Sequence, residues 1–231
     1  MNILAIDTAT DKLSVAIASE SSKWFFEADA GLRHSELVMD CIDMLMKKAS
    51  LEPADLNGVV CMGGPGSFTG LRIGFSVAKG LALSLGIPFA PISTLDCMAR
   101  PLSSIPGIIV PVIDAKQKAF FCSMYSGSIK LCLDMDITAE EFLAETQKLK
   151  NEKSEVSFWL TGPGSALLCE KLPNPLPDYI RPGTNLPYGN ALTLLEMAGE
   201  NNIFVNSADN LLSGPDYIRK SDAEIQLTKK I

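Results

Sequence analysis

The chain has 231 residues, of which 47% are apolar and 20% are charged. This is enough apolar material for a folded core, so disorder over most of the chain is excluded. Lys and Arg number 20 against 27 Asp and Glu, which gives a net charge of −7. Proteins that bind nucleic acid by themselves are usually basic, so any role on RNA or DNA is expected to run through a partner.

A signal for export or membrane insertion is not expected in this sequence. It lacks a run of about 18 apolar residues, which a membrane-spanning helix requires, and its N-terminus lacks the basic region of a secretory signal. The six cysteines form no CxxC pair and the only histidine is His34, so zinc-finger spacing is missing. We therefore expect a cytoplasmic protein with reduced, buried cysteines.

The first hundred residues predict three strands followed by alternating helices and strands. Apolar residues alternate at Leu13, Val15 and Ile17, as in a half-buried strand. The expected strands are 2–8, 12–19, 23–28, 57–62 and 88–92, and the expected helices are 34–48 and 71–85. The resulting order is βββαβαβ.

The second half repeats this plan. VPVID at 110–114 matches ILAID at 3–7, since each apolar run ends in an aspartate, and TGPGS at 161–165 again follows a strand with a glycine turn and a helix. We therefore expect an internal duplication, with a first lobe at 1–103 and a second lobe at 104–213. Residues 214–231 form a tail that could rejoin the first lobe, and 173–187, with five prolines, are expected to be an irregular connection before a helix at 188–200.

Two motifs are candidates for an anion or nucleotide site. Asp7 ends the first strand, where a carboxylate can hold a cation or a water beside a phosphate. Gly63, Gly64, Gly66 and Ser67 lie in GGPGSFTG, whose exposed amides before a helix suit an anion. Each has a structural alternative: a turn-forming aspartate, and a tight strand-to-helix connection capped by Ser67 or Thr69. His34 stands at the start of a helix and is more readily explained by the helix start or an interface than by catalysis.

The two long helices have unusually wide apolar faces. Each covers an arc of about 220°, where an ordinary surface helix needs about 100°. This surplus favours a partner interface over helices enclosed in the protein's own core. The candidate interface residues are Leu37, Val38, Cys41, Ile42 and Leu45 in the first helix and Gly74, Val77, Ala78 and Leu81 in the second.

The segments ILAIDTATDKLSVAIA, RHSELVMDCIDMLM and GGPGSFTGLRIGFSVAKGLALSLGIP closely resemble the TsaB (YeaZ) family, as does PDYIR at 215–219. The resemblance is strong over residues 1–100 and looser beyond them. It implies an α/β protein with a duplicated ribonuclease-H-like or actin-like (ASKHA) fold, in two lobes that each have a mixed sheet and flanking helices. It also implies a role in forming threonylcarbamoyladenosine (t6A) beside the anticodon of tRNA.

The resemblance further implies a non-catalytic subunit that pairs with a larger catalytic paralogue, TsaD, and with an ATPase, TsaE. In this family the divalent metal and the ATP or ADP belong to the partner proteins, and the subunit forms a homodimer when alone. By this alignment Thr94 and Met98 stand where TsaD has metal-binding histidines, and neither is a good ligand for such an ion. The two wide apolar helices would form the TsaD contact.

Three other functions are weighed against this one. The main alternative is an ATP-binding phosphotransferase or ATPase of the actin-like fold that uses Asp7, Asp114 and residues 63–67. A peptidase is least favoured because the metal-ligand histidines are missing. An additional role as a protein-interaction module is not excluded by any residue of the sequence.

Overall fold

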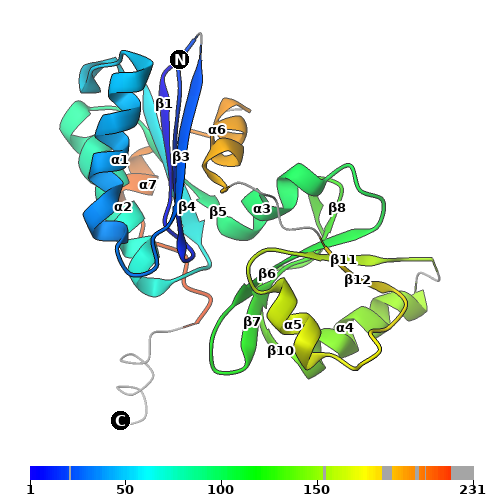
Figure 1. Cartoon of the computed structure of the whole chain (residues 1–231). Coiled ribbons are helices and arrows are strands. Elements are labelled where there is room, and N and C mark those ends of the chain that lie inside the picture. Colours follow the sequence, from blue (N-terminus) through cyan, green and yellow to red (C-terminus); the bar gives the residue numbers. More distant parts are fainter. Residues whose placement is uncertain (21, 153–154, 184–188, 201–202, 206, 220–231) are drawn as a thin grey trace. The chain divides into compact units, whose positions relative to one another are not determined.

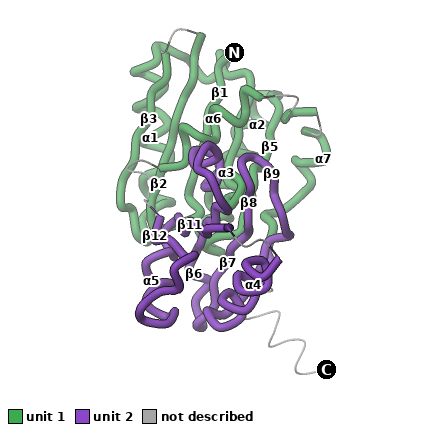
Figure 2. Tube along the Cα trace, turned by 90° about the vertical axis from the view of Figure 1, so that its right-hand side faces the viewer, with its two compact units in different colours: residues 1–97, 187–216 green, residues 98–186, 217–231 purple. Residues whose placement is uncertain are grey.

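The computed structural model describes residues 1–20, 22–152, 155–183, 189–200, 203–205 and 207–219. The chain divides into two compact units, residues 1–97 with 187–216 and residues 98–186 with 217–231 (Figure 2). Each unit has its own mixed β-sheet and its own hydrophobic core.

Unit 1 follows the predicted order βββαβαβ and adds helices from later in the chain. Its strands are β1 (Ile3–Asp7), β2 (Lys12–Ala18), β3 (Lys23–Asp29), β4 (Gly58–Gly64) and β5 (Phe89–Ser93). Its helices are α1 (His34–Ala49), α2 (Phe68–Leu85), α6 (Ala191–Gly199) and α7 (Ser207–Leu212). A short helix, α3 (Thr94–Ala99), contains the point where the chain passes to unit 2.

The sheet of unit 1 is covered by helices on both faces (Figure 1). Its strand order is β3-β2-β1-β4-β5, with β1 antiparallel to β2 and parallel to β4. Helices α1 and α2 pack on one face over Leu4, Ile6 and Val15, and α6 packs against β1, β2 and β4 on the other face. Helix α7 lies against the edge strand β5.

Unit 2 is built on the same plan. Its strands are β6 (Ile108–Asp114), β7 (Ala119–Cys122), β8 (Tyr125–Ser126), β9 (Ile129–Lys130), β10 (Met135–Thr138), β11 (Phe158–Thr161) and β12 (Ile180–Pro182). Its helices are α4 (Ala139–Glu152) and α5 (Ser165–Lys171). Phe142 of α4 and Leu168 of α5 pack with Phe158 in its core.

The two sheets confirm the predicted duplication. The order β10-β7-β6-β11-β12 repeats β3-β2-β1-β4-β5 strand for strand. The directions also agree, because β6 is antiparallel to β7 and parallel to β11, as β1 is to β2 and β4. Each unit therefore has the ribonuclease-H-like arrangement, and the chain has the duplicated actin-like (ASKHA) fold.

The division between the units differs from the expected lobes in two places. The chain enters unit 2 at residue 98 instead of 104, and residues 187–213 belong to unit 1 although they are expected in the second lobe. The reason is packing, because α6 contacts β1, β2 and β4 and α7 contacts β5. Of the expected tail, residues up to 216 lie with unit 1 and 217–219 with unit 2, while 220–231 lie outside the described residues.

The connection at 173–187 is not wholly irregular. Residues 180–182 form the short strand β12 beside β11, despite the prolines around them. In the part of the chain that the structure describes, no helix is both long and apolar enough to cross a lipid bilayer.

Candidate functional site

The glycine loop, residues 63–70, connects the end of β4 to the start of α2. The Oγ of Ser67 accepts a hydrogen bond from the N–H of Gly70 at 3.2 Å, so Ser67 caps the helix. The N–H of Ser67 donates to the carbonyl of Ala9 at 2.7 Å. Ser67 therefore serves the tight strand-to-helix connection, one of the two roles that the sequence left open.

The glycines of this loop allow close contact between backbone segments. A Cβ on Gly66 would lie 2.6 Å from the carbonyl oxygen of Ala9. Gly64 has a φ of +115°, and a Cβ there would overlap the carbonyl oxygen of Asp216. The N–H of Asp216 donates to the carbonyl of Gly63 at 2.7 Å. Backbone of the same unit thus packs directly against the loop at Ala9 and at Asp216.

Asp7 lies at the same end of the sheet as the loop, because β1 and β4 are parallel neighbours and both end there. Its Oδ1 accepts from the N–H of Ala9 and its Oδ2 accepts from the Nδ2 of Asn190, each at 2.9 Å. Removal from water raises the pKa of Asp7, and these hydrogen bonds offset the rise only in part. Asp7 therefore joins the β1–β2 turn to the start of α6. Nucleotide or anion binding by Asp7 and residues 63–67 stays a prediction.

Most of the predicted interface residues lie in the core of unit 1. The buried members are Val38, Cys41, Ile42, Leu45, Gly74 and Ala78, and the partly exposed ones are Leu37, Val77 and Leu81. The reason is that α1 and α2 contact each other on one face of the sheet, so each helix buries a flank against its neighbour as well as against the strands. The unit's own packing thus explains much of the wide apolar arc.

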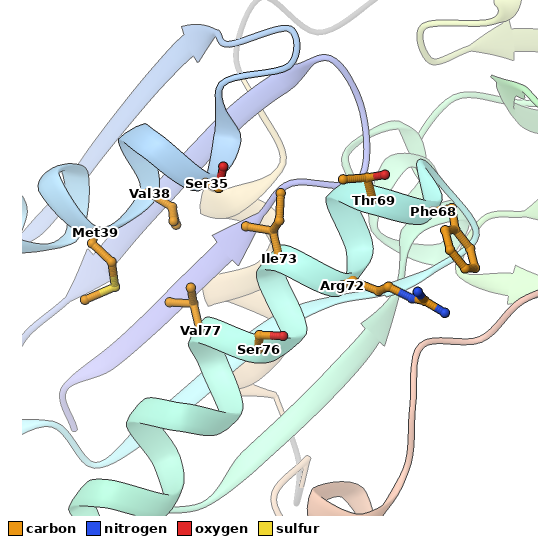
Figure 3. Close-up of a pocket in the computed structure, with 9 residues that line it drawn as sticks. All are labelled: Ser35, Val38, Met39, Phe68, Thr69, Arg72, Ile73, Ser76 and Val77. Carbon is orange, nitrogen blue, oxygen red and sulfur yellow. The ribbon is translucent and has the colours of Figure 1, made fainter.

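A groove of about 450 Å³ lies between α1 and α2 (Figure 3). Met39 is 47% exposed and Phe68 is 37% exposed, so the groove presents large apolar side chains to the surface. The guanidinium of Arg72 lies 3.8 Å above the ring of Phe68 and places a cation at one end. The groove is lined by Ser35, Val38, Met39, Phe68, Thr69, Arg72, Ile73, Ser76 and Val77.

Comparison with known proteins relates the whole chain to one family. The tRNA threonylcarbamoyladenosine biosynthesis protein TsaB of Bacillus subtilis is 30% identical over 97% of this chain and 96% of its own length. The chain belongs to the TsaB (YeaZ) family. The TsaB of Haemophilus influenzae is 26% identical over 95% of this chain and 94% of its own. The model of the family described as "TsaD: tRNA N6-adenosine threonylcarbamoyltransferase" matches residues 28–174.

Solved structures share the fold. A Pseudomonas aeruginosa protein described as uncharacterized with similarity to peptidase YeaZ has a TM-score of 0.72 at 21% identity, over 94% of this chain and 99% of that chain. YeaZ from the same organism has a TM-score of 0.70 at 20% identity, with the same coverage. Membership of the TsaB family places this chain among proteins of t6A biosynthesis.

The two positions that the family resemblance aligns with metal-binding histidines are buried. Thr94 and Met98 both lie on α3 with little or no exposed surface. Within the described ranges, no group of three or more His, Cys, Asp or Glu side chains could hold a metal ion.

Asp114 is the counterpart of Asp7 in unit 2, at the end of β6. Its Oδ1 accepts from the N–H of Lys116 and its Oδ2 pairs with the ammonium of Lys116, both at 2.8 Å. Partial burial acts to raise the pKa of Asp114, but the bonds from Lys116 outweigh it and hold the pKa below its ordinary value. Both aspartates predicted for a phosphotransferase site thus have partners within their own units.

His34 is the first residue of α1 and is buried. Its Nε2 has no hydrogen-bond partner among the residues that the structure describes. This places the only histidine at the start of the helix, in keeping with the first of the two roles that the sequence favoured.

Sequence reasoning missed Asn190 and Lys79. Asn190 binds Asp7 from 183 residues away, in a segment that the sequence assigned to the other lobe. The ammonium of Lys79 donates to the carbonyl of Leu211 at 3.0 Å and to the carbonyl of Ser213. Neither residue has a local pattern that could reveal a partner so distant along the chain.

The raised pKa of Asp7 predicts a loss of stability with rising pH. The unfolded chain releases this proton near the ordinary pKa of 3.8, whereas the folded chain holds it to a higher pH. Its contribution is therefore complete below pH 3.8 and is lost as the pH rises through the folded pKa. In urea unfolding from pH 4 to 8, the free energy of unfolding of the wild type minus that of Asp7→Asn should fall. A difference that stays flat or increases would contradict the burial effect.

Proposed function

We propose that this chain is a non-catalytic subunit in t6A biosynthesis that pairs with the catalytic paralogue TsaD. The observation that carries the proposal is the apolar groove between α1 and α2, which exposes Met39 and Phe68 and is lined by Val77 and Ile73. Membership of the TsaB family is the reason for assigning the chain to t6A biosynthesis. The proposed contact is therefore the groove and its rim, including the partly exposed Leu37 and Leu81. Of the six predicted interface residues that are buried, only Val38 lines the groove.

The rest of the proposed assembly follows the family resemblance. TsaE, an ATPase, would join the pair, and the metal and the ATP or ADP would belong to the partner proteins. In the absence of TsaD the groove would pair with a second copy, as a two-fold symmetric homodimer. The internal bonds of Asp7 and Ser67 favour this role over a phosphotransferase, because those groups already have protein partners.

The chain mixed with TsaD from the same organism is expected to form a one-to-one complex in size-exclusion chromatography with light scattering. Val77→Asp should weaken this complex roughly a hundredfold or more, because an unpaired carboxylate in an apolar contact costs several kcal/mol. Leu83→Asp is the matched control, since Leu83 lies on the same helix, is 65% exposed and does not line the groove.

The control should bind TsaD as the wild type does. Normal binding by Val77→Asp, or equal loss in both variants, would rule out the groove as the contact. A wild-type chain that ignores TsaD altogether would refute the proposed function.

A further inference from the structure

Strand β3 is the outermost strand of the unit 1 sheet. Its inner edge pairs with β2 from Lys23 opposite Ala18 to Asp29 opposite Lys12. Among the described residues the sheet order ends at β3, whereas the opposite edge strand, β5, has α7 beside it. Strand β3 therefore has seven residues of backbone along an edge of the green unit (Figure 2).

Large aromatic side chains are exposed on this edge strand. Trp24 is 40% exposed and Phe25 is 50% exposed, and as consecutive residues they lie on opposite faces of the strand. Phe26 is partly buried and packs against the core beneath α1. Natural edge strands are usually short, charged, bent by bulges or covered, because an open edge pairs with other chains. An open edge that carries exposed aromatic residues is consistent with a pairing surface.

The charges at the two ends of β3 favour a second copy of this chain as the occupant. The strand reads KWFFEAD, with a basic residue at its first position and an acidic residue at its last. An antiparallel pair of identical strands centred on residue 26 places residue 23 of each copy opposite residue 29 of the other. Lys23 then faces Asp29 at both ends of the pair. The two ends of the strand are thus complementary in charge to each other, while Glu27 lies opposite Phe25 and has its own partner in Lys12 of β2.

We infer that β3 pairs antiparallel with β3 of a second copy, with Phe26 on the two-fold axis. Residues directly opposite each other share a face of the joined sheet. Phe26 meets its own counterpart, and Trp24 lies opposite the small Ala28, which leaves space for the indole. Phe25 lies diagonally across from its counterpart, within reach for aromatic side chains. Together with two Lys23–Asp29 pairs, these contacts define a single register.

This pairing goes beyond the proposed function and does not depend on it. The β3 contact uses residues 23–29, whereas the groove is lined by residues of α1 and α2. A chain whose groove is occupied can therefore still pair through β3.

A charge swap tests the register. In a Val77→Asp background, which removes pairing through the groove, the chain should show a monomer–dimer equilibrium by analytical ultracentrifugation. Adding Lys23→Glu or Asp29→Lys should raise the dissociation constant about tenfold or more, because two attractive pairs become repulsive. Adding both changes restores attraction and should return the constant to within about threefold of the background. Lys171→Glu, an exposed residue of unit 2, is the control for the same change in charge.

The pairing is overturned if the Val77→Asp chain stays monomeric at every concentration. It is also overturned if substitutions at residues 23 and 29 leave the dissociation constant of its dimer unchanged. Failure of the double change to restore the dimer would also overturn the proposed register. These experiments measure self-association and not binding to TsaD. The β3 pairing and the proposed function can therefore be refuted independently of each other. A dimer that disappears with Lys171→Glu as readily as with Lys23→Glu would indicate a general charge effect and reject the pairing.

Discussion

Replacing Leu45 with aspartate is expected to prevent unit 1 from folding stably. Leu45 is 3% exposed and packs in the core cluster beneath α1. Removal of a buried leucine side chain alone costs about 2–5 kcal/mol, and an unpaired buried carboxylate adds to that cost. The combined loss approaches the total stability of a typical domain, about 5–15 kcal/mol.

Met44→Asp is the matched control for this substitution. Met44 is the preceding residue of α1 and is 39% exposed, so its carboxylate would remain in water and the fold should survive. Urea unfolding followed by circular dichroism separates the two variants. A Leu45→Asp chain that unfolds at the wild-type urea concentration would show that Leu45 is not part of the core.

The contrast between Leu45 and Val77 shows how far helical periodicity could define the site. The spacing of apolar residues correctly predicts two amphipathic helices at about 34–48 and 71–85. It also gives the width of each apolar face. It cannot say what covers that face, because a neighbouring helix and a partner protein both require apolar residues. Contact between α1 and α2 accounts for the predicted interface residues that are buried. Val77, by contrast, lines the groove between the two helices.

The duplicated fold could be predicted because its signals are local. In each sheet the first strand along the chain, β1 or β6, is apolar and ends in an aspartate, Asp7 or Asp114. In each half a later strand is followed by a glycine turn and a helix. The division of the chain could not be predicted in this way. Helix α6 joins unit 1 through Asn190 and its contacts with β1, β2 and β4, and such long-range packing leaves no mark on the local sequence.

The small residues of α2 also have a role that sequence alone assigned differently. Small residues stand at positions 70, 74, 78 and 82, and two of them, Gly74 and Ala78, are among the residues predicted from the sequence for a partner interface. All four are buried in the structure, and at Gly70 and Gly74 the close neighbour is Thr8 of the β1–β2 turn. The Oγ1 of Thr8 donates to the carbonyl of Gly70 at 2.7 Å. At Gly70 the missing side chain lets α2 approach the backbone of Thr8, and at Gly74 it leaves room for the side chain of Thr8.

Gly70→Ala is therefore expected to destabilise the chain by at least about 2 kcal/mol, the cost of forcing a methyl group into a packed site. Its Cβ would overlap the carbonyl oxygen of Thr8, which belongs to backbone and cannot rotate away. Gly80→Ala is the same change on the same helix, at an exposed position where a Cβ meets no atom within 4 Å. It should stabilise the chain by about 0.5–1 kcal/mol, because alanine loses less backbone entropy in a helix.

Thermal or urea unfolding of the two glycine variants gives opposite shifts if α2 lies against the β1–β2 turn as described. Since helix propensity favours alanine at both positions, the sign at residue 70 is reversed by the close contacts of the added methyl group, of which the one with Thr8 is the tightest. A stabilising effect of Gly70→Ala would mean that the helix start is not held against Thr8. In that case the carbonyl of Thr8 would not cover the start of α2, and the amides there would again be candidates for binding an anion.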